Sequence, residues 1–192
     1  MSKMDVKPVI TILPVGSVDP EILRHISRKL SEKFGLKCDV SEISYDVPKE
    51  AYSPLRRQYL ASYFVQIAEF HARRTGALRV LSITDVNIYA PGLNFVFGEA
   101  RIWGRGAVIS LFMLRPEVYG DPPNFNLLVE RAIKEAIHEI GHTFGLNHCS
   151  NPVCIMRFSN SIWDTDAKSE DFCEKCFNVL RRNIARALSD RG

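Results

Sequence analysis

The chain has 192 residues, a formal net charge of +3 and a pI near 8.6. This weak positive charge indicates neither nucleic acid nor a membrane surface as a partner, and no apolar run is long enough to span a bilayer. A chain of this length can bury roughly 70% of its unfolded surface, so we expect a single domain, residues 1–192.

The N-terminal residues, Met1 to Asp5, lack the apolar segment of a secretory signal. We therefore expect a cytoplasmic protein. Because that compartment is reducing, the five cysteines are expected to be free or to bind metal.

Strands and helices alternate through the first half of the chain. An apolar, β-branched run ends at Gly16, and Asp19 with Pro20 indicates the start of a helix. The expected elements are a strand at 8–15, a helix at 20–34, a strand at 36–44, a helix at 54–74 and a strand at 78–84. Strands joined by helices pair in parallel through right-handed crossovers, so we expect a largely parallel sheet.

Two histidines and one cysteine in this half are expected to be structural. His25 lies at the edge of the first helix's apolar stripe, and His71 follows Ile67 by one turn. We expect both to be packed or solvated without a metal. Cys38, within the second strand, is most simply a small core residue.

A hairpin is expected in the middle of the chain. Residues 95–102 and 107–114 are typical of strands, and Gly104-Arg105-Gly106 favours a turn between them. An ordinary hairpin without a binding role is the simplest interpretation, because periodicity alone does not show function.

A long helix is expected next, with Asn124 or Asn126 as its N-cap. Its apolar residues between 129 and 144 form a core-facing side. This places His138 and His142 on the other side, facing a cleft.

The segment from His138 to His148 has the spacing of a catalytic zinc site. Histidines at i and i+4 project from one helical face, so His138 and His142 can bind one metal. Gly145 can take the left-handed conformation that ends a helix, which lets His148 supply the third ligand. Water would fill the fourth position, and Glu139 could accept its proton. Chance histidines on a helix are the alternative, but five residues in register over eleven positions disfavour it.

At this motif the sequence resembles the metzincin metallopeptidases, whose motif HExxHxxGxxH is followed by a turn with a methionine. Met156 stands eight residues after His148, where that turn is expected. The following cysteines narrow the resemblance, over residues 138–176, to the archaemetzincins. It implies two Zn²⁺ per chain and assigns Glu139 as catalytic base, Met156 as the turn methionine, His138, His142 and His148 as catalytic zinc ligands, and Cys149, Cys154, Cys173 and Cys176 as structural zinc ligands.

Each cysteine assignment has an alternative. Two disulfides could join the four clustered cysteines, although a reducing compartment disfavours them. Cys38 could be a thiol that blocks the catalytic zinc, although no propeptide is visible. After an irregular segment from residue 146, a last helix is expected to hold Cys173 and Cys176 in its first turns, where the positive helix end stabilises thiolates.

The resemblance implies an α/β (α+β) metzincin-like fold. Its features are a mixed, mostly parallel sheet with an antiparallel edge strand, backing helices, an active-site helix and a small zinc-stapled C-terminal subdomain. The cleft would separate an upper subdomain, about 1–145, from a lower one, about 146–192. The edge strand, within residues 95–102, would bind peptide by strand addition.

The implied reaction is hydrolysis of a peptide or small protein by a monomer. Aminopeptidase activity is one option, which needs an acidic group for the terminal amine, and Glu99 is a weak candidate. Phe158 stands where some metzincins have a tyrosine that binds the oxyanion, so that donor is absent. The alternative function is a zinc-ribbon-like binding module with a vestigial peptidase site, supported only by Arg181, Arg182 and Arg186.

Overall fold

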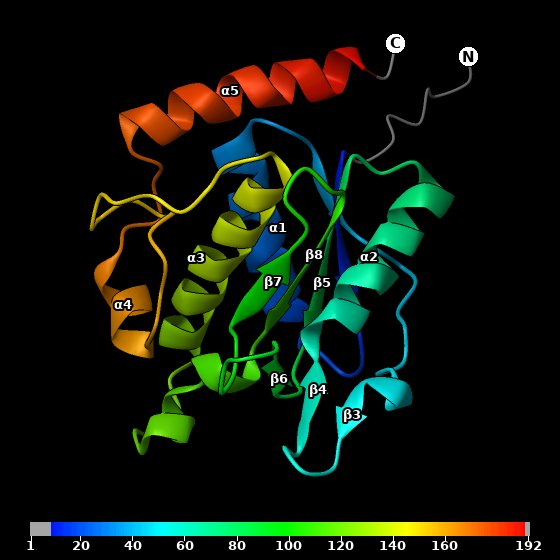
Figure 1. Ribbon diagram of the computed structural model, residues 1–192, viewed down its shortest axis with the longest axis vertical. Helices are drawn as coiled ribbons and strands as arrows, with labels where there is room; N and C mark the ends of the chain where they lie inside the picture. Colours follow the sequence, from blue (N-terminus) through cyan, green and yellow to red (C-terminus); the bar gives the residue numbers. More distant parts are fainter. Residues whose placement is uncertain (1–8, 191–192) are drawn as a thin grey trace.

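A five-stranded sheet lies at the centre of the computed structural model, which describes residues 9–190 (Figure 1). Its strands are β1 (Ile10–Pro14), β2 (Cys38–Val40), β5 (Arg79–Thr84), β7 (Gly98–Ala100) and β8 (Gly106–Ser110), in the order β2-β1-β5-β8-β7. β2, β1, β5 and β8 pair in parallel, whereas β7 is an antiparallel edge strand. The predicted mixed sheet and its antiparallel edge are therefore confirmed.

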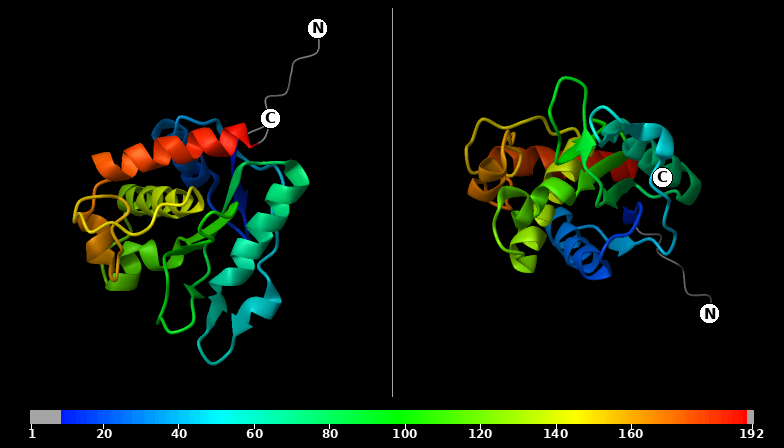
Figure 2. Two further views of the ribbon diagram at one scale, coloured as in Figure 1. Left: turned by 45° about the horizontal axis from the view of Figure 1, so that its top comes forward. Right: turned by 90° about the horizontal axis from the view of Figure 1, so that it is seen from below.

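Helices cover both faces of this sheet. α1 (Pro20–Phe34) and α3 (Phe125–Thr143) lie on one face, and α2 (Ala61–Thr75) lies on the other (Figure 2). The short helix α4 (Ile162–Ala167) follows, and α5 (Glu174–Ser189) runs across the C-terminal end of α3 (Figure 1). No helix among residues 9–190 is long and apolar enough to cross a membrane.

The ends of the first and third helices follow the predicted capping signals. The Asp19 side chain accepts a hydrogen bond from the Glu21 amide at 2.8 Å, and Gly35 ends α1 with a φ of 63°. Asn124 accepts from the Leu127 amide at 3.0 Å at the start of α3. These caps satisfy amides that a helix start leaves without partners, so local sequence sets where both helices begin.

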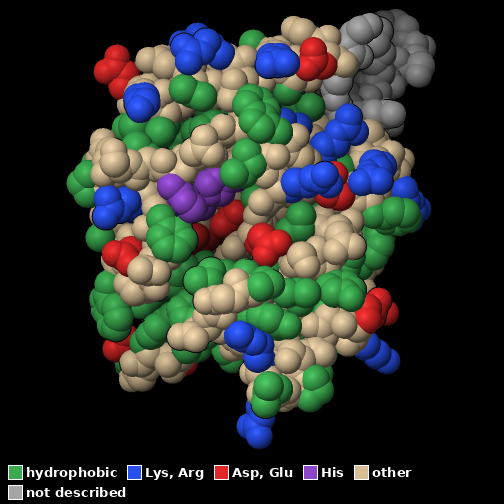
Figure 3. Space-filling view, viewed as in Figure 1, with side chains coloured by type: hydrophobic (Ala, Val, Ile, Leu, Met, Phe, Trp, Pro, Cys, Tyr) green, Lys and Arg blue, Asp and Glu red, His purple; other side chains and the backbone are tan. Residues whose placement is uncertain are grey.

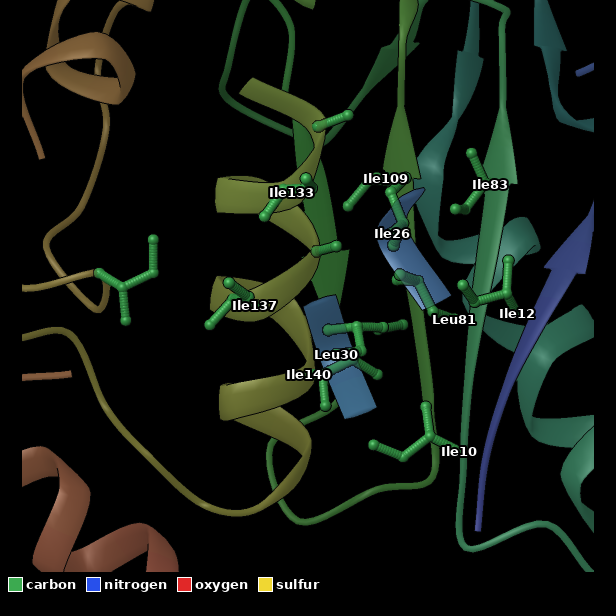
Figure 4. Close-up of a cluster of buried hydrophobic side chains, with 14 of the residues drawn as sticks. Ile10, Ile12, Ile26, Leu30, Leu81, Ile83, Ile109, Ile133, Ile137 and Ile140 are labelled. Atoms are coloured by element: carbon green, nitrogen blue, oxygen red, sulfur yellow. The ribbon is translucent and has the colours of Figure 1, made fainter. Parts of the chain in front are cut away.

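The main core lies between the sheet, α1 and α3. Isoleucines and leucines from β1, β5, α1 and α3 gather there (Figure 4). Along β1, Ile10 and Ile12 belong to this core, whereas Leu13 packs with Ala68 of α2 on the other face. Both faces of β1 are therefore buried, one against α1 and α3 and the other against α2.

The prediction of a helix from Pro54 to Arg74 is wrong at its start. α2 begins at Ala61, and the preceding residues form β3 (Tyr52–Ser53) and β4 (Gln58–Leu60), which pair in a small sheet with β6 (Ile88–Tyr89). Gln58 binds across this region, donating from Nε2 to the Asn94 carbonyl at 2.8 Å. The apolar spacing of the predicted helix places Phe70 on its buried side. In the structure Phe70 is 52% exposed, because Ala68, His71 and Ala72 form the packed side instead.

The strands predicted at 36–44, 95–102 and 107–114 are shorter in the structure. Serine side chains mark two of the early ends: Ser110 Oγ accepts from the Phe112 amide and Ser41 Oγ from the Ile43 amide, both at 3.1 Å, and such local bonds compete with strand pairing. β7 ends at Ala100, where a turn starts. Residues 107–114 thus become β8 and a 3₁₀ turn, Phe112–Leu114, and two further 3₁₀ turns cover Lys49–Ala51 and Pro116–Tyr119.

The C-terminal part also departs from expectation. The segment after residue 146 is not wholly irregular, because Ser161 and Asp164 form a capping box that starts α4. The apolar spacing of the last helix predicts one packed side that includes Phe177 and Leu188. In α5 these two residues are each 43% exposed, and only Cys176 and Leu180 are buried.

Candidate functional site

Three histidines meet beside the C-terminal part of α3. His138 and His142 are buried on that helix, and Gly145, with a φ of 83°, turns the chain so that His148 joins them. One ring nitrogen from each lies within 4.8 Å of the others. Figure 3 shows histidine side chains at the rim of a hollow. The structure therefore brings together the three predicted ligands, whereas His25 and His71 lie outside this group.

Backbone carbonyls orient two of the imidazoles. His138 Nδ1–H donates to the Ile155 carbonyl at 2.8 Å, and His142 Nδ1–H donates to the Leu146 carbonyl at 2.7 Å. Both Nε2 atoms then carry lone pairs, and they lie 3.0 Å apart. Two such acceptors repel each other unless a cation lies between them, and tetrahedral zinc would separate them by about 3.3 Å. This donor set fits a zinc ion.

Burial keeps these imidazoles neutral. It lowers the pKa of His142 to about 4, and it lowers the pKa of His138 well below its usual range. The pKa of the more exposed His148 is also lowered, by burial and by the Lys168 ammonium. Neutral imidazole is the form that binds a metal, so the site is ready for a cation at neutral pH.

The histidines line a cavity of about 310 Å³ under the edge of the sheet. Glu139 and Glu135 of α3, Glu99 of β7 and Phe158 are also in its wall. Burial raises the pKa of Glu139 well above its usual range, and the charge of Glu135 adds to this effect. A carboxylate with a raised pKa is a better proton acceptor.

The edge strand passes directly over Glu139. A Cβ at Gly98 would lie 2.6 Å from Glu139 Cγ and 2.8 Å from its Oε1, so glycine permits this approach. Phe97 and Arg101 bond to β8 through their backbone groups, and bonded pairs alternate along antiparallel strands. The N–H and C=O groups of Gly98 and Ala100 therefore face the open side of β7.

Four cysteines form a second cluster, beyond His148. One sulfur from each of Cys149, Cys154, Cys173 and Cys176 lies within 4.8 Å of the others, and all four are free thiols. The sulfurs of Cys149 and Cys173 are 3.8 Å apart. Tetrahedral zinc with a Zn–S distance of about 2.3 Å would separate them by about 3.8 Å, so the cluster fits zinc and not two disulfides.

The position of Cys173 at the start of a helix stabilises its thiolate. Cys173 is the N-cap of α5, and the Cys176 amide hydrogen bond is the main cause that lowers the pKa of Cys173 to about 7. Cys38 lies outside the cluster, and burial raises its pKa to about 12. It is the buried core thiol expected from the sequence.

The two clusters share the segment from His148 to Met156. The Cys149 amide donates to the Met156 carbonyl at 2.9 Å, which closes this segment into a loop. Ile155, whose carbonyl orients His138, lies between Cys154 and Met156. One loop therefore contacts both clusters.

Comparison with known proteins shows the relationship of this arrangement. The sequence model of peptidase family M54 matches residues 48–182, more than half of the chain. The chain belongs to peptidase family M54, the archaemetzincins. It is 45% identical to an archaemetzincin from Pyrococcus abyssi, covering 93% of this chain and 97% of that protein. It is 47% identical to one from Methanocaldococcus jannaschii, covering 90% and 92%. The sequence resemblance is therefore confirmed, and the family is one of zinc metallopeptidases.

Solved archaemetzincin structures share the fold. That from Methanopyrus kandleri superposes with a TM-score of 0.80 at 36% identity, covering 95% of this chain and 98% of that one. A zinc-dependent peptidase from Methanocorpusculum labreanum gives 0.79 at 28%, covering 89% and 99%. Metalloproteinase-II from Bacteroides fragilis, 13% identical with a TM-score of 0.56, covering 93% and 54%, shares the fold alone.

The sequence interpretation missed one polar cluster of this M54 chain. Lys168 is fully buried and lies 3.0 Å from Glu135 Oε1, which also accepts from Thr165 Oγ1 at 3.0 Å. These contacts join α3 to the end of α4 behind the cavity. The available signal was Glu135 itself, which lies one helical turn before Glu139 on the face assigned to the cleft.

Proposed function

We propose that this chain is a metzincin-type zinc peptidase, with a catalytic zinc held by His138, His142 and His148. The observation that supports it is the position of Glu139, which lines one cavity with the three histidines under the free edge of β7. A buried carboxylate beside a metal-binding group is the arrangement that hydrolysis by activated water requires.

Bound zinc would acidify a water molecule and polarise the substrate carbonyl. Glu139 would accept the proton of the attacking water and return it to the leaving amine. Phe158 packs against His148 with ring centroids 5.0 Å apart and carries no hydrogen-bond donor. No side-chain hydroxyl at position 158 can therefore bind the oxyanion.

The substrate would be a peptide or a small protein bound along β7. Gly98 and Ala100 turn their backbone groups toward the cleft, so an extended peptide can add to the sheet there. Its scissile bond would then lie close to Glu139, which contacts Gly98. We propose aminopeptidase activity as the specific form of this function.

A second, structural zinc would be held by Cys149, Cys154, Cys173 and Cys176, giving two ions per chain. Four thiolates form a closed site, whereas three histidines leave one position open to a chelator. Mild chelation is expected to remove one equivalent before the other. Release of both ions in one step would contradict two sites of different kind.

We also propose that the cleft divides the chain into two subdomains. The upper subdomain, about 1–145, would hold the sheet edge and α3, and the lower one, about 146–192, would hold the Met156 turn and the cysteines. We propose that the protein acts as a monomer in the cytoplasm, without nucleic acid or membrane partners.

The deciding experiment replaces Glu139 with glutamine, which keeps the shape of the side chain and removes the base. Zinc content is expected to stay at two per chain, and peptide hydrolysis is expected to fall by roughly 100-fold to 10,000-fold. A panel of short peptides followed by mass spectrometry measures the rate and shows which end is cleaved. Equal peptide hydrolysis by Glu139→Gln and the native protein would overturn the role of Glu139, whereas no hydrolysis by either protein would favour the zinc-binding module.

A further inference from the structure

The ionisable side chains in the cavity wall, apart from the histidines, are all acidic. They are Glu99, Glu135 and Glu139, and no lysine or arginine lines the cavity. Away from the proposed zinc, a substrate carboxylate would therefore meet acidic side chains and no cationic one in the cavity wall, which disfavours carboxypeptidase action.

Two of these carboxylates already have assigned partners or roles. Glu135 is paired with the buried Lys168 and accepts from Thr165. Glu139 is the proposed base. Glu99 is different, because no hydrogen bond or ion pair joins its carboxylate to any residue between 9 and 190, including Arg101 on the same side of its strand.

The Glu99 side chain is nevertheless partly shielded from solvent. It is half-buried in the cavity wall, and burial alone raises its pKa. It is close enough to Glu139 for its charge to act on that group. A carboxylate withdrawn from water without a partner is unfavourable, and a cation placed beside it relieves that cost.

We propose that Glu99 is a specificity-determining residue that binds a cationic group of the substrate. Glu99 lies on β7 between Gly98 and Ala100, whose backbone groups face the proposed peptide path. The Glu99 side chain lies on the face of β7 opposite to Gly98 and Glu139, the face that carries Val108. The bound group therefore belongs to a substrate residue next to the one whose peptide bond would lie at Glu139. The ammonium of a free N-terminus and the side chain of lysine or arginine share this chemistry, and the test separates them. The inference rests on the proposed peptidase function.

The test uses the full-length zinc-loaded protein and four peptides of one sequence. The N-terminus is free or acetylated, and the first residue is lysine or norleucine. Native protein is expected to cleave the peptide that carries the recognised cation roughly 10-fold or more faster, in kcat/KM, than the peptide with neither cation. In Glu99→Gln this ratio is expected to fall to near 1. Glu50→Gln, which removes an exposed carboxylate outside the cavity, should keep the native ratio.

The pattern of the four rates identifies the source of the cation. Loss of preference on acetylation indicates the N-terminal ammonium, and loss on exchange of lysine for norleucine indicates the side chain. A native preference that Glu99→Gln leaves unchanged, an equal fall for all four peptides in that variant, or no preference in native protein would overturn the assignment.

A binding measurement separates this inference from the proposed function. Calorimetry with Glu139→Gln and with Glu139→Gln/Glu99→Gln measures peptide affinity without turnover. Cation-bearing peptide is expected to bind roughly 10-fold more weakly to the double variant, and the acetylated norleucine peptide should not show this difference. If the cation-bearing peptide binds the two variants unequally but the native protein hydrolyses no peptide, the proposed peptidase function is rejected and the cation site stands. Equal binding in an active enzyme would reject only the cation site.

Discussion

Gly141 lies on α3 directly before His142, where the helix meets the methionine turn. A Cβ there would lie 2.7 Å from Met156 Sδ and 3.3 Å from its Cε. Met156 is itself fully buried, so its thioether cannot move freely out of the way. The absence of a side chain at this position thus allows Met156 to pack against α3 beside the three histidines.

Replacing Gly141 with alanine is therefore expected to destabilise the protein by about 1–2 kcal/mol, as overpacking does. Elsewhere in a helix the same change stabilises by about 1 kcal/mol. In a Met156→Ala background the overlap is gone, so Gly141→Ala should become stabilising. Urea unfolding of the native protein, both single variants and the double variant measures the effect of Gly141→Ala on the free energy of unfolding in each background. The same effect in both backgrounds would show that contact with Met156 does not cause the destabilisation.

The histidine site is expected to keep its zinc in mild acid. Burial lowers the pKa of His142 to about 4, so the imidazole stays neutral, and protons compete weakly for it, until the pH falls well below 6.5. Native protein dialysed at about pH 5.5 should therefore retain most zinc at this site. Zinc analysis over a pH series tests this, with half-release at pH 6.5 or above as the contrary result.

At the scale of secondary structure, polar contacts attach α4 to α3. Arg131 makes two bonds of 2.7 Å to the Asp166 carboxylate, and Lys134 Nζ donates to the Asp166 carbonyl at 3.1 Å. The pair of Glu135 and Lys168 lies further along the same face. α4 has six residues and could not persist alone, so these contacts hold the cavity wall near Phe158.

Removing one member of the buried pair is expected to be costly. Lys168→Met should lower the free energy of unfolding by about 3–5 kcal/mol, because it leaves Glu135 buried with an uncompensated charge. Glu135→Gln in the same protein removes that charge and keeps the bond from Thr165, so the double variant should recover about half of the loss. A double-mutant cycle in urea measures the coupling, and additive losses would contradict it.

Features that depend on residues close together in the sequence could be predicted. The caps Asp19 and Asn124, the latter one of two candidates, marked the starts of α1 and α3. The spacing of His138, His142 and His148 predicted that these three side chains meet, as they do in the structure. The start of α2 could not be predicted in this way, because Pro54 suits a turn as well as a first helical turn. What decides it is the pairing of residues 59–60 with 88–89, far along the chain.

The polar cluster behind the cavity escaped prediction for the same reason. Glu135 and Lys168 are 33 positions apart, and the place of Glu135 on the cleft side of α3 does not indicate its partner. Asp166 likewise meets Arg131 across 35 positions. The spacing of apolar residues shows which side of its own helix or strand a residue lies on. These contacts depend instead on where α4 packs in three dimensions.

At the scale of the whole molecule, the cysteine cluster is expected to control the histidine site. Cys149 follows His148 directly, and Ile155, beside Cys154, orients His138 through its carbonyl. Loss of the cysteine-bound metal should release this loop and with it two of the three histidines.

Cys149→Ser and Cys176→Ser are therefore both expected to weaken zinc binding at the histidines by roughly 10-fold to 100-fold. Competition with a chelator measures this affinity, and Cys38→Ser, a thiol outside the cluster, is the control. Weakening in Cys149→Ser alone would mean that Cys149 acts directly at the histidine-bound metal.

The position of α5 across the end of α3 has a consequence for synthesis on the ribosome. Every strand of the main sheet and the first two histidines precede residue 145, but two cysteines and α5 emerge last. Asn183 of α5 donates to the Phe144 carbonyl at 2.7 Å, closing the helix end next to the metal site. A nascent chain arrested before Cys173 thus has the complete β7 edge but only two of the four clustered cysteines. Chains released at residue 172 should hydrolyse no peptide, so unfinished translation products would carry no stray proteolytic activity.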